Sequence, residues 1–226
     1  MFNKVLKLFN FTALPCLVWT NRGIIWQFTK RAVESRYRGS ILGLLWSFIH
    51  PLMMLFIYTF VFSIVFKARW NIATDNLTGS FPVVMFAGMM MYNIFQEAVL
   101  LSCSSVTGNQ NLVKKVVFSV EVLPMSQCLT TFILSLAWLP LLIISALLVF
   151  KELHWTVILF PIVILPLLFF TLGVSFFVSS LSVFIRDMQY VVGIVLQVLF
   201  FMTPVFYPVE NVPERFRIIL EVNPLS

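Results

Sequence analysis

Glu97 is the residue of this sequence whose type and position best suit chemistry. It stands with Asn93 and Gln96 inside an otherwise apolar stretch, residues 81–106. An ionisable group inside a membrane helix is costly to bury, which makes Glu97 an intramembrane polar candidate for a functional role. The structural alternative is that Glu97 faces other helices and is protonated or paired there. His50 has no Cys, carboxylate or second His near it at metal-ligand spacing, so we expect no metal site.

Motifs that would make the chain an enzyme are absent from the sequence. It has no HExxH pair and no GxSxG elbow, and no two of its glycines stand five apart, as a P-loop requires. We therefore expect no catalytic residues and no cofactor in this chain. If the protein moves a cargo with ATP, another chain must hold the ATP and its Mg²⁺. The three widely spaced cysteines predict neither a disulfide framework nor a zinc site.

The composition places the whole chain in a membrane. Of its 226 residues, 60% are hydrophobic and 11% are charged, and the mean hydropathy is +0.99. A soluble domain carries about 25% charged residues, so little of the chain is left for one. The formal charge of +6 raises the question of a nucleic-acid partner. Because the cations flank apolar runs, they indicate membrane orientation instead, and we expect no nucleic acid.

Five apolar runs predict an all-α integral membrane fold with five transmembrane helices in a single domain, residues 1–226. About 20 apolar residues suffice to cross a bilayer of roughly 30 Å. Pro51 predicts a kink in the first helix, and Gly39 and Gly43 at its start form a GxxxG pattern that permits close helix approach. The predicted spans occupy residues 41–66, 81–106, 129–150, 156–184 and 190–206.

The lead-in, residues 1–40, is expected to lie in the cytoplasm and to contain an amphipathic helix along the membrane surface. Within residues 20–37, Ile24, Ile25 and Phe28 recur at near-helical spacing, with charged residues elsewhere around the helix. An irregular tail is the alternative. With the N-terminus inside, ten of the fifteen Lys and Arg residues lie on the inner side, which predicts a cytoplasmic N-terminus.

Three classes of membrane protein fit these features: a transporter membrane subunit, a membrane-embedded enzyme, and a structural or channel-forming protein. An enzyme would want several intramembrane Asp, Glu or His residues, whereas only Glu97 and His50 qualify. A channel would want a polar stripe repeated along one helix, and none is visible. The transporter subunit leads, although composition alone does not select it.

Four stretches of the sequence resemble, in order and spacing, the type-2 ABC export permeases. The closest likeness is to the branch that exports lipid-linked polysaccharides such as O-antigen, capsule and teichoic acid. The resemblance covers nearly the whole chain, except that relatives often have Pro-Arg at Ser119-Val120. The matching stretches are Arg36-Tyr37-Arg38-Gly39-Ser40 with Leu45-Trp46-Ser47 and Pro51, Asn111 to Val116 with Glu121 and Leu123-Pro124, Arg186-Asp187, and Thr203 to Pro208 with Pro213 and Asn223-Pro224.

The resemblance implies a permease half in the bacterial inner (cytoplasmic) membrane. Two copies of the chain would form a homodimeric pathway for a lipid-linked polysaccharide. Two copies of a separate ABC ATPase subunit would dock below them and hold the ATP and Mg²⁺. The alternative is a type-2 exporter of drugs or lipids. Because the family has a sixth helix after the Asn-Pro pair, the chain is expected to be truncated before that span.

The loop between the second and third spans is the candidate contact with the ATPase. It lacks a span-like run, yet it is too long for a simple turn. Its charged residues would set the orientation of the contact and its apolar residues would carry it, the alternative being a solvated loop. The candidate coupling residues are Leu112, Lys114, Lys115, Phe118 and Glu121.

The outer segment, residues 207–226, is expected to form short re-entrant gate helices. Pro204 and Pro208 would stop the fifth span. A helix starting near Pro213 would set Phe216 and Leu220 on one face, four residues apart. The candidate pathway and gate residues are Phe206, Tyr207, Phe216 and Leu220, the alternative being a surface cap that only packs.

Overall fold

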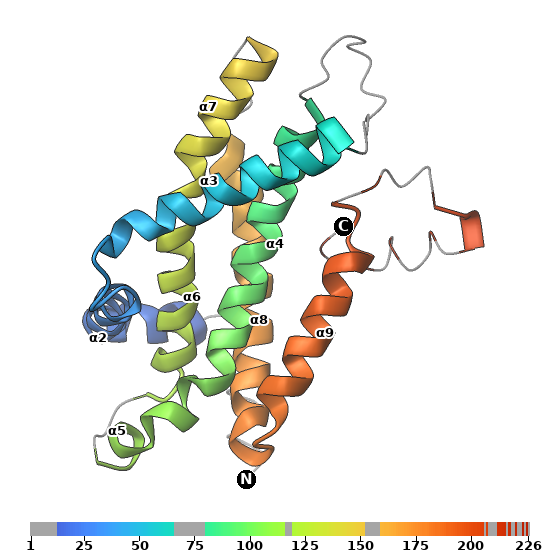
Figure 1. Cartoon of the computed structure of the whole chain (residues 1–226). Helices are drawn as coiled ribbons and strands as arrows, with labels where there is room; N and C mark the ends of the chain where they lie inside the picture. Colours follow the sequence, from blue (N-terminus) through green and yellow to red (C-terminus); the bar gives the residue numbers. More distant parts are fainter. Residues whose placement is uncertain are drawn as a thin grey trace.

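The protein is an all-helical bundle in the part of the chain that its computed structural model describes (Figure 1). Four described helical stretches are long and apolar enough to cross a membrane, which confirms the predicted all-α integral membrane fold; they are Gly43–Phe62, Phe81–Ser105, Val122–Phe150 and Ile162–Phe184. The fifth predicted span is α9 (Met188–Met202), whose 15 residues fall short of the roughly 20 that cross a bilayer. The described residues are 13–65, 80–115, 119–151, 159–205, 207, 212–215, 217, 220, 223 and 225.

Helix α4 (Ser80–Ser105) forms the centre of the bundle. It packs against α8 (Phe160–Phe184), α6 (Val122–Ser135) and α9, and Figure 1 shows these helices running along the long axis. Its buried side chains include Phe86, Ile94, Val99 and Cys103. Because α4 is covered by neighbours while α8 and α9 keep broad exposed apolar faces, the polar side chains of Asn93, Gln96 and Glu97 on α4 are partly buried.

Helix α2 (Ala13–Arg36) lies across the upright helices in Figure 1. Its buried Ile25 packs against Val122 and Met125 at the start of α6. Thr29 adds a polar tie, since its hydroxyl donates to the Ser126 carbonyl at 3.5 Å and to the Ile25 carbonyl at 2.8 Å. The helix predicted for residues 20–37 is therefore present, and it begins earlier, by Ala13.

The first span does not begin as a helix at residue 41. Gly39 and Gly43 have φ values of +87° and +51°, and the chain turns between them into a short 3₁₀ segment, η1 (Gly43–Leu45). Helix α3 (Trp46–Tyr58) follows with Pro51 inside it, and continues into a π-helical segment, η2 (Thr59–Val65). Among the described residues, apart from the glycine's own chain neighbours, no atom lies within 4 Å of a Cβ placed on either glycine. The two glycines thus serve the turn, not a close helix approach.

The third span begins at Val122, seven residues before the predicted residue 129. Pro124 stands in the first turn of α6, where its missing N–H removes no helical hydrogen bond. The span then breaks before α7 (Trp138–Phe150). Pro140 explains the break, because it cannot donate to the Leu136 carbonyl and its ring would crowd that oxygen.

The fifth apolar helix, α9, ends at Met202, four residues before the predicted end of the span. Thr203 is extended, with φ −92° and ψ 132°. Pro204 disfavours helical geometry in the residue before it, which is Thr203. The last helical residue is therefore Met202. The predicted start of the fourth span, residues 156–158, lies outside the described residues.

Small polar residues line the contact between α4 and α8, which we call the serine seam. The hydroxyl oxygens of Ser105 and Ser179 lie 3.2 Å apart, and Ser182 donates to the Cys103 carbonyl at 2.7 Å. Small side chains let helix backbones approach, and their hydroxyls bond across the contact. The seam consists of Ser102, Ser105, Ser175, Ser179 and Ser182, all buried.

Candidate functional site in the helical bundle

Glu97 on α4 forms a salt bridge with Arg36, the last residue of α2. The two residues are 61 positions apart, and their side chains are 23% and 34% exposed. The structure thus bears out the alternative in which Glu97 is paired. Sequence reasoning missed Arg36 as the partner, since it entered only as part of a motif. The pair joins the helix that lies across the bundle to the central helix of the bundle.

The salt bridge lines a cavity of about 510 Å³ between the end of α2 and helices α3, α4, α6 and α7. Its wall is unusual for a membrane bundle, because it combines aromatic rings with polar side chains. No hydrogen bond joins the His50 ring or the Asn93 amide to the described part of the chain. Besides Arg36 and Glu97, the lining residues are Tyr37, Trp46, Ser47, His50, Pro51, Asn93, Leu134, Ser135 and Trp138.

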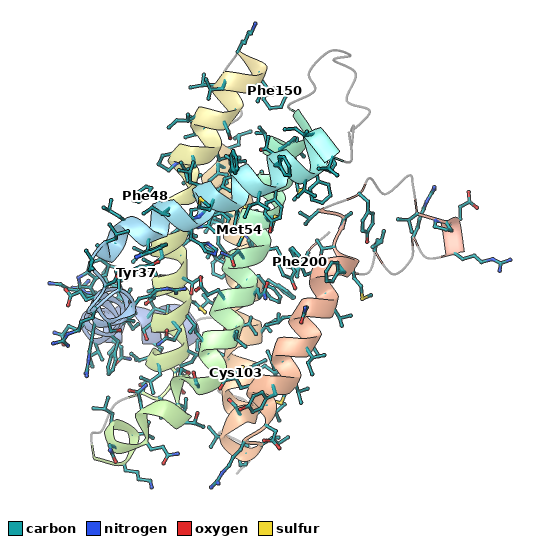
Figure 2. All side chains as sticks on the ribbon, viewed as in Figure 1. Tyr37, Phe48, Met54, Cys103, Phe150 and Phe200 are labelled. Carbon is teal, nitrogen blue, oxygen red and sulfur yellow. The ribbon has the colours of Figure 1, made fainter. Side chains whose placement is uncertain are left out.

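Packing holds the aromatic wall of this cavity in place. The Trp138 ring stacks on Phe86 with centroids 5.4 Å apart and is tilted against the His50 ring at 6.5 Å. The Trp46 indole N–H donates to the Ser40 hydroxyl at 3.0 Å. Figure 2 shows Tyr37 where α2 gives way to α3. The cavity therefore has fixed ring faces beside unpaired polar groups.

The candidate coupling residues that the structure describes lie at one end of the molecule. Leu112 is half-buried and Lys114 exposed on α5 (Gln110–Lys115), which lies at the same end as the turn between α8 and α9 in Figure 1. Glu121 is exposed before α6 and lines a groove of about 250 Å³ with Phe176 of α8. The Lys115 side chain and Phe118 lie outside the described residues.

The outer segment is tied to the end of α9. The Tyr207 hydroxyl donates to the Phe201 carbonyl at 2.9 Å. The Asn223 amide donates to the Thr203 hydroxyl at 3.1 Å, so the two ends of this matching stretch meet. Leu220 is helical and 5% exposed, whereas Phe206 and Phe216 lie outside the described residues.

Several apolar helices of spanning length, with a further helix lying across them, define a multi-pass membrane protein. The chain belongs to the ABC-2 type transporter family, which it matches over residues 24–226. The expectation of a transporter membrane subunit is thereby confirmed, and the enzyme and channel alternatives are set aside.

Curated relatives match nearly the whole chain. An O-antigen export system permease protein, RfbA, of Myxococcus xanthus is 32% identical over 206 residues, covering 90% of this chain and 76% of the relative. Two proteins of the same name from Klebsiella pneumoniae are 30% and 31% identical. Each covers 88% of this chain, which in turn covers 74% of each relative.

Proposed function

We propose that the chain is the permease subunit of an ATP-driven exporter that moves a lipid-linked polysaccharide from the cytoplasmic to the outer side of the bacterial inner membrane. The observation that carries the proposal is the similarity to O-antigen export permeases along about nine-tenths of the chain. It includes the helices that build the ion-paired cavity, so the likeness is not confined to one motif.

A second candidate, an exporter of drugs or lipids, is favoured by an apolar cavity. This cavity of about 610 Å³ lies between α4, α8 and the end of α9, and its wall includes Val84, Met91, Leu167 and Phe170. An apolar cargo would suit such a wall better than a sugar would. The two candidates share the fold, so cargo must be decided by experiment.

Deleting the gene should abolish surface polysaccharide in the strain that carries it. Lipid-linked polymer should accumulate inside the cell, because synthesis continues while export stops. Gel separation of surface and intracellular polymer, with the wild-type gene restored on a plasmid, measures both effects. Unchanged surface polymer together with altered drug sensitivity or lipid export would favour the second candidate.

Energy would come from two copies of a separate ABC ATPase docked on two copies of this chain. The end of the bundle that carries Lys114 and Glu121 would face the cytoplasm and receive the ATPase. Exposed charges there would orient the contact, and Leu112, Phe118 and their apolar neighbours would supply its buried area. Lys151, at the far end of α7, would then face outward (Figure 1).

Cysteine labelling tests both the orientation and the docking. Lys114→Cys and Lys151→Cys are placed in a chain whose native cysteines are replaced, and an impermeant maleimide is added to intact cells. We expect labelling at 151 and not at 114. In inverted vesicles the 114 variant should label, and the ATPase subunit should protect it. Labelling of the 114 variant from outside would overturn the orientation, and full labelling with the ATPase bound would exclude docking there.

A further inference from the structure

We propose that the ion-paired cavity is a binding site for a neutral sugar ring of the transported polymer. The proposal rests on the proposed function for its cargo, and it assigns part of the recognition of that cargo to residues inside a single copy of the chain. Four features of the cavity carry it: its unpaired polar groups, its internal charge balance, its exposed ring faces and its size.

The polar groups of the cavity favour a polar occupant over an apolar one. Asn93 stands on α4, which is long and apolar enough to span a membrane, and His50 stands on α3. Neither side chain forms a hydrogen bond with the described residues. Asn93 is half-buried and His50 is exposed, so the Asn93 amide is the group that most needs a polar partner when water leaves the cavity. The volume of about 510 Å³ lies within the usual range of small-molecule sites. An acyl chain would leave these groups unpaired, whereas hydroxyl groups would pair them.

The charge of the cavity favours a neutral occupant. Arg36 and Glu97 neutralise each other, so the wall presents no net cation to a phosphate group. The Glu97 carboxylate also repels an anion that approaches Arg36. A hydroxyl group can donate to the carboxylate and accept from Asn93, which stands one helical turn away on the same face of α4. Such hydrogen bonds to an ionised group are the strong ones.

The rings of the cavity suit the flat face of a sugar. A pyranose ring carries hydroxyls at its rim and C–H groups on its faces, and flat aromatic surfaces cover such apolar faces well. Trp46 is 43% exposed, and its bond to Ser40 holds the indole in place. A ring lying on Trp46 would place its rim toward polar groups such as Asn93 and Glu97, which share the same cavity. The wall thus offers stacking and hydrogen bonding together.

Photoaffinity labelling of the full chain in lipid nanodiscs tests the site. The probe is a neutral hexose trisaccharide carrying a diazirine, and the labelled peptides are mapped by mass spectrometry. We expect labels on residues 46–51 or 93–97, suppressed by excess unlabelled trisaccharide and not by inorganic pyrophosphate. Asn93→Leu and Trp46→Leu should each cut the labelling about fivefold, which corresponds to the loss of one hydrogen bond or stacking contact.

Trp26→Leu is the matched control, because Trp26 is 60% exposed on α2 and does not line the cavity. Its labelling should equal that of the wild type, and monodisperse elution would show that each variant is folded. Equal labelling in all three variants would overturn the site. Suppression by pyrophosphate alone would overturn it in favour of an anionic headgroup.

The site and the proposed function fail in different ways. No labelling of the wild type, in a strain whose deletion mutant loses surface polymer, would overturn the site and leave the function standing. If the trisaccharide probe labels the cavity specifically but deletion of the gene leaves the surface polymer intact, the site is supported and the proposed function is overturned.

Discussion

Replacing Glu97 with leucine should destabilise the permease by about 2 kcal/mol. The substitution leaves the Arg36 guanidinium without its partner in a partly buried site. Breaking a fully buried ion pair in this way costs roughly 3–5 kcal/mol. The Glu97 side chain is 23% exposed and the Arg36 side chain is 34% exposed, so solvent screens part of that cost. The midpoint of thermal unfolding in detergent and the yield of monodisperse protein measure the effect.

A second ion pair in the same chain supplies the control. The Lys30 ammonium lies 4.0 Å from a Glu34 carboxylate oxygen on α2, and both side chains are about two-thirds exposed. Exposed pairs of this kind contribute roughly 0.3–0.5 kcal/mol, so Glu34→Leu should shift the midpoint little. The double exchange Arg36→Glu with Glu97→Arg should recover part of the loss. Equal shifts for Glu34→Leu and Glu97→Leu would show that the Arg36–Glu97 pair stabilises the fold no more than an exposed pair does.

The membrane fold was predictable because the bilayer leaves a chain few options. Long uncharged runs must satisfy their own backbone hydrogen bonds, and only a helix does so within one segment. Element ends were less predictable, since they depend on local chemistry. Gly43 takes a positive φ that delays the first helix, and Pro204 ends α9 early. The third span begins earlier than predicted, because a proline such as Pro124 is accepted in the first turn of α6.

The candidate site was predictable only in part. Glu97 stood out because a carboxylate inside an apolar run is rare, but its partner Arg36 is 61 residues away and no spacing rule joins them. Lys114 and Glu121 came from the resemblance, and the structure places both at one end of the bundle. Their contact with an ATPase stays a prediction.

The serine seam escaped sequence analysis although a signal for it existed. Ser175, Ser179 and Ser182 recur at intervals of four and three residues, which places them on one face of a helix. Hydropathy scales give serine a nearly neutral value, so the stretch that contains these three serines is predicted only as an apolar span. The seam becomes visible once α4 supplies Ser105 opposite Ser179.

Ser179→Leu should have a large effect on folding, because it places a branched side chain where α4 and α8 meet. Ser179 is 2% exposed, and its hydroxyl oxygen lies 3.2 Å from that of Ser105. Inserting carbon atoms into a packed contact costs roughly 1–3 kcal/mol, and more where backbones must separate. Ser179→Ala should cost only about 0.6 kcal/mol, since it removes one hydrogen bond and keeps the close approach.

The neighbouring residue separates crowding at the seam from a general effect of leucine on α8. Ser180 is exposed and donates to the Phe176 carbonyl of its own helix at 2.8 Å, so Ser180→Leu should leave the midpoint of thermal unfolding near that of the wild type. Size-exclusion profiles of the three variants in detergent rank their folded fractions. We expect Ser180→Leu to resemble the wild type, Ser179→Ala to follow closely, and Ser179→Leu to lose most of its monodisperse peak. If Ser179→Leu eluted like Ser180→Leu, the α4–α8 contact would tolerate bulk, and small side chains would not be what holds these helices together.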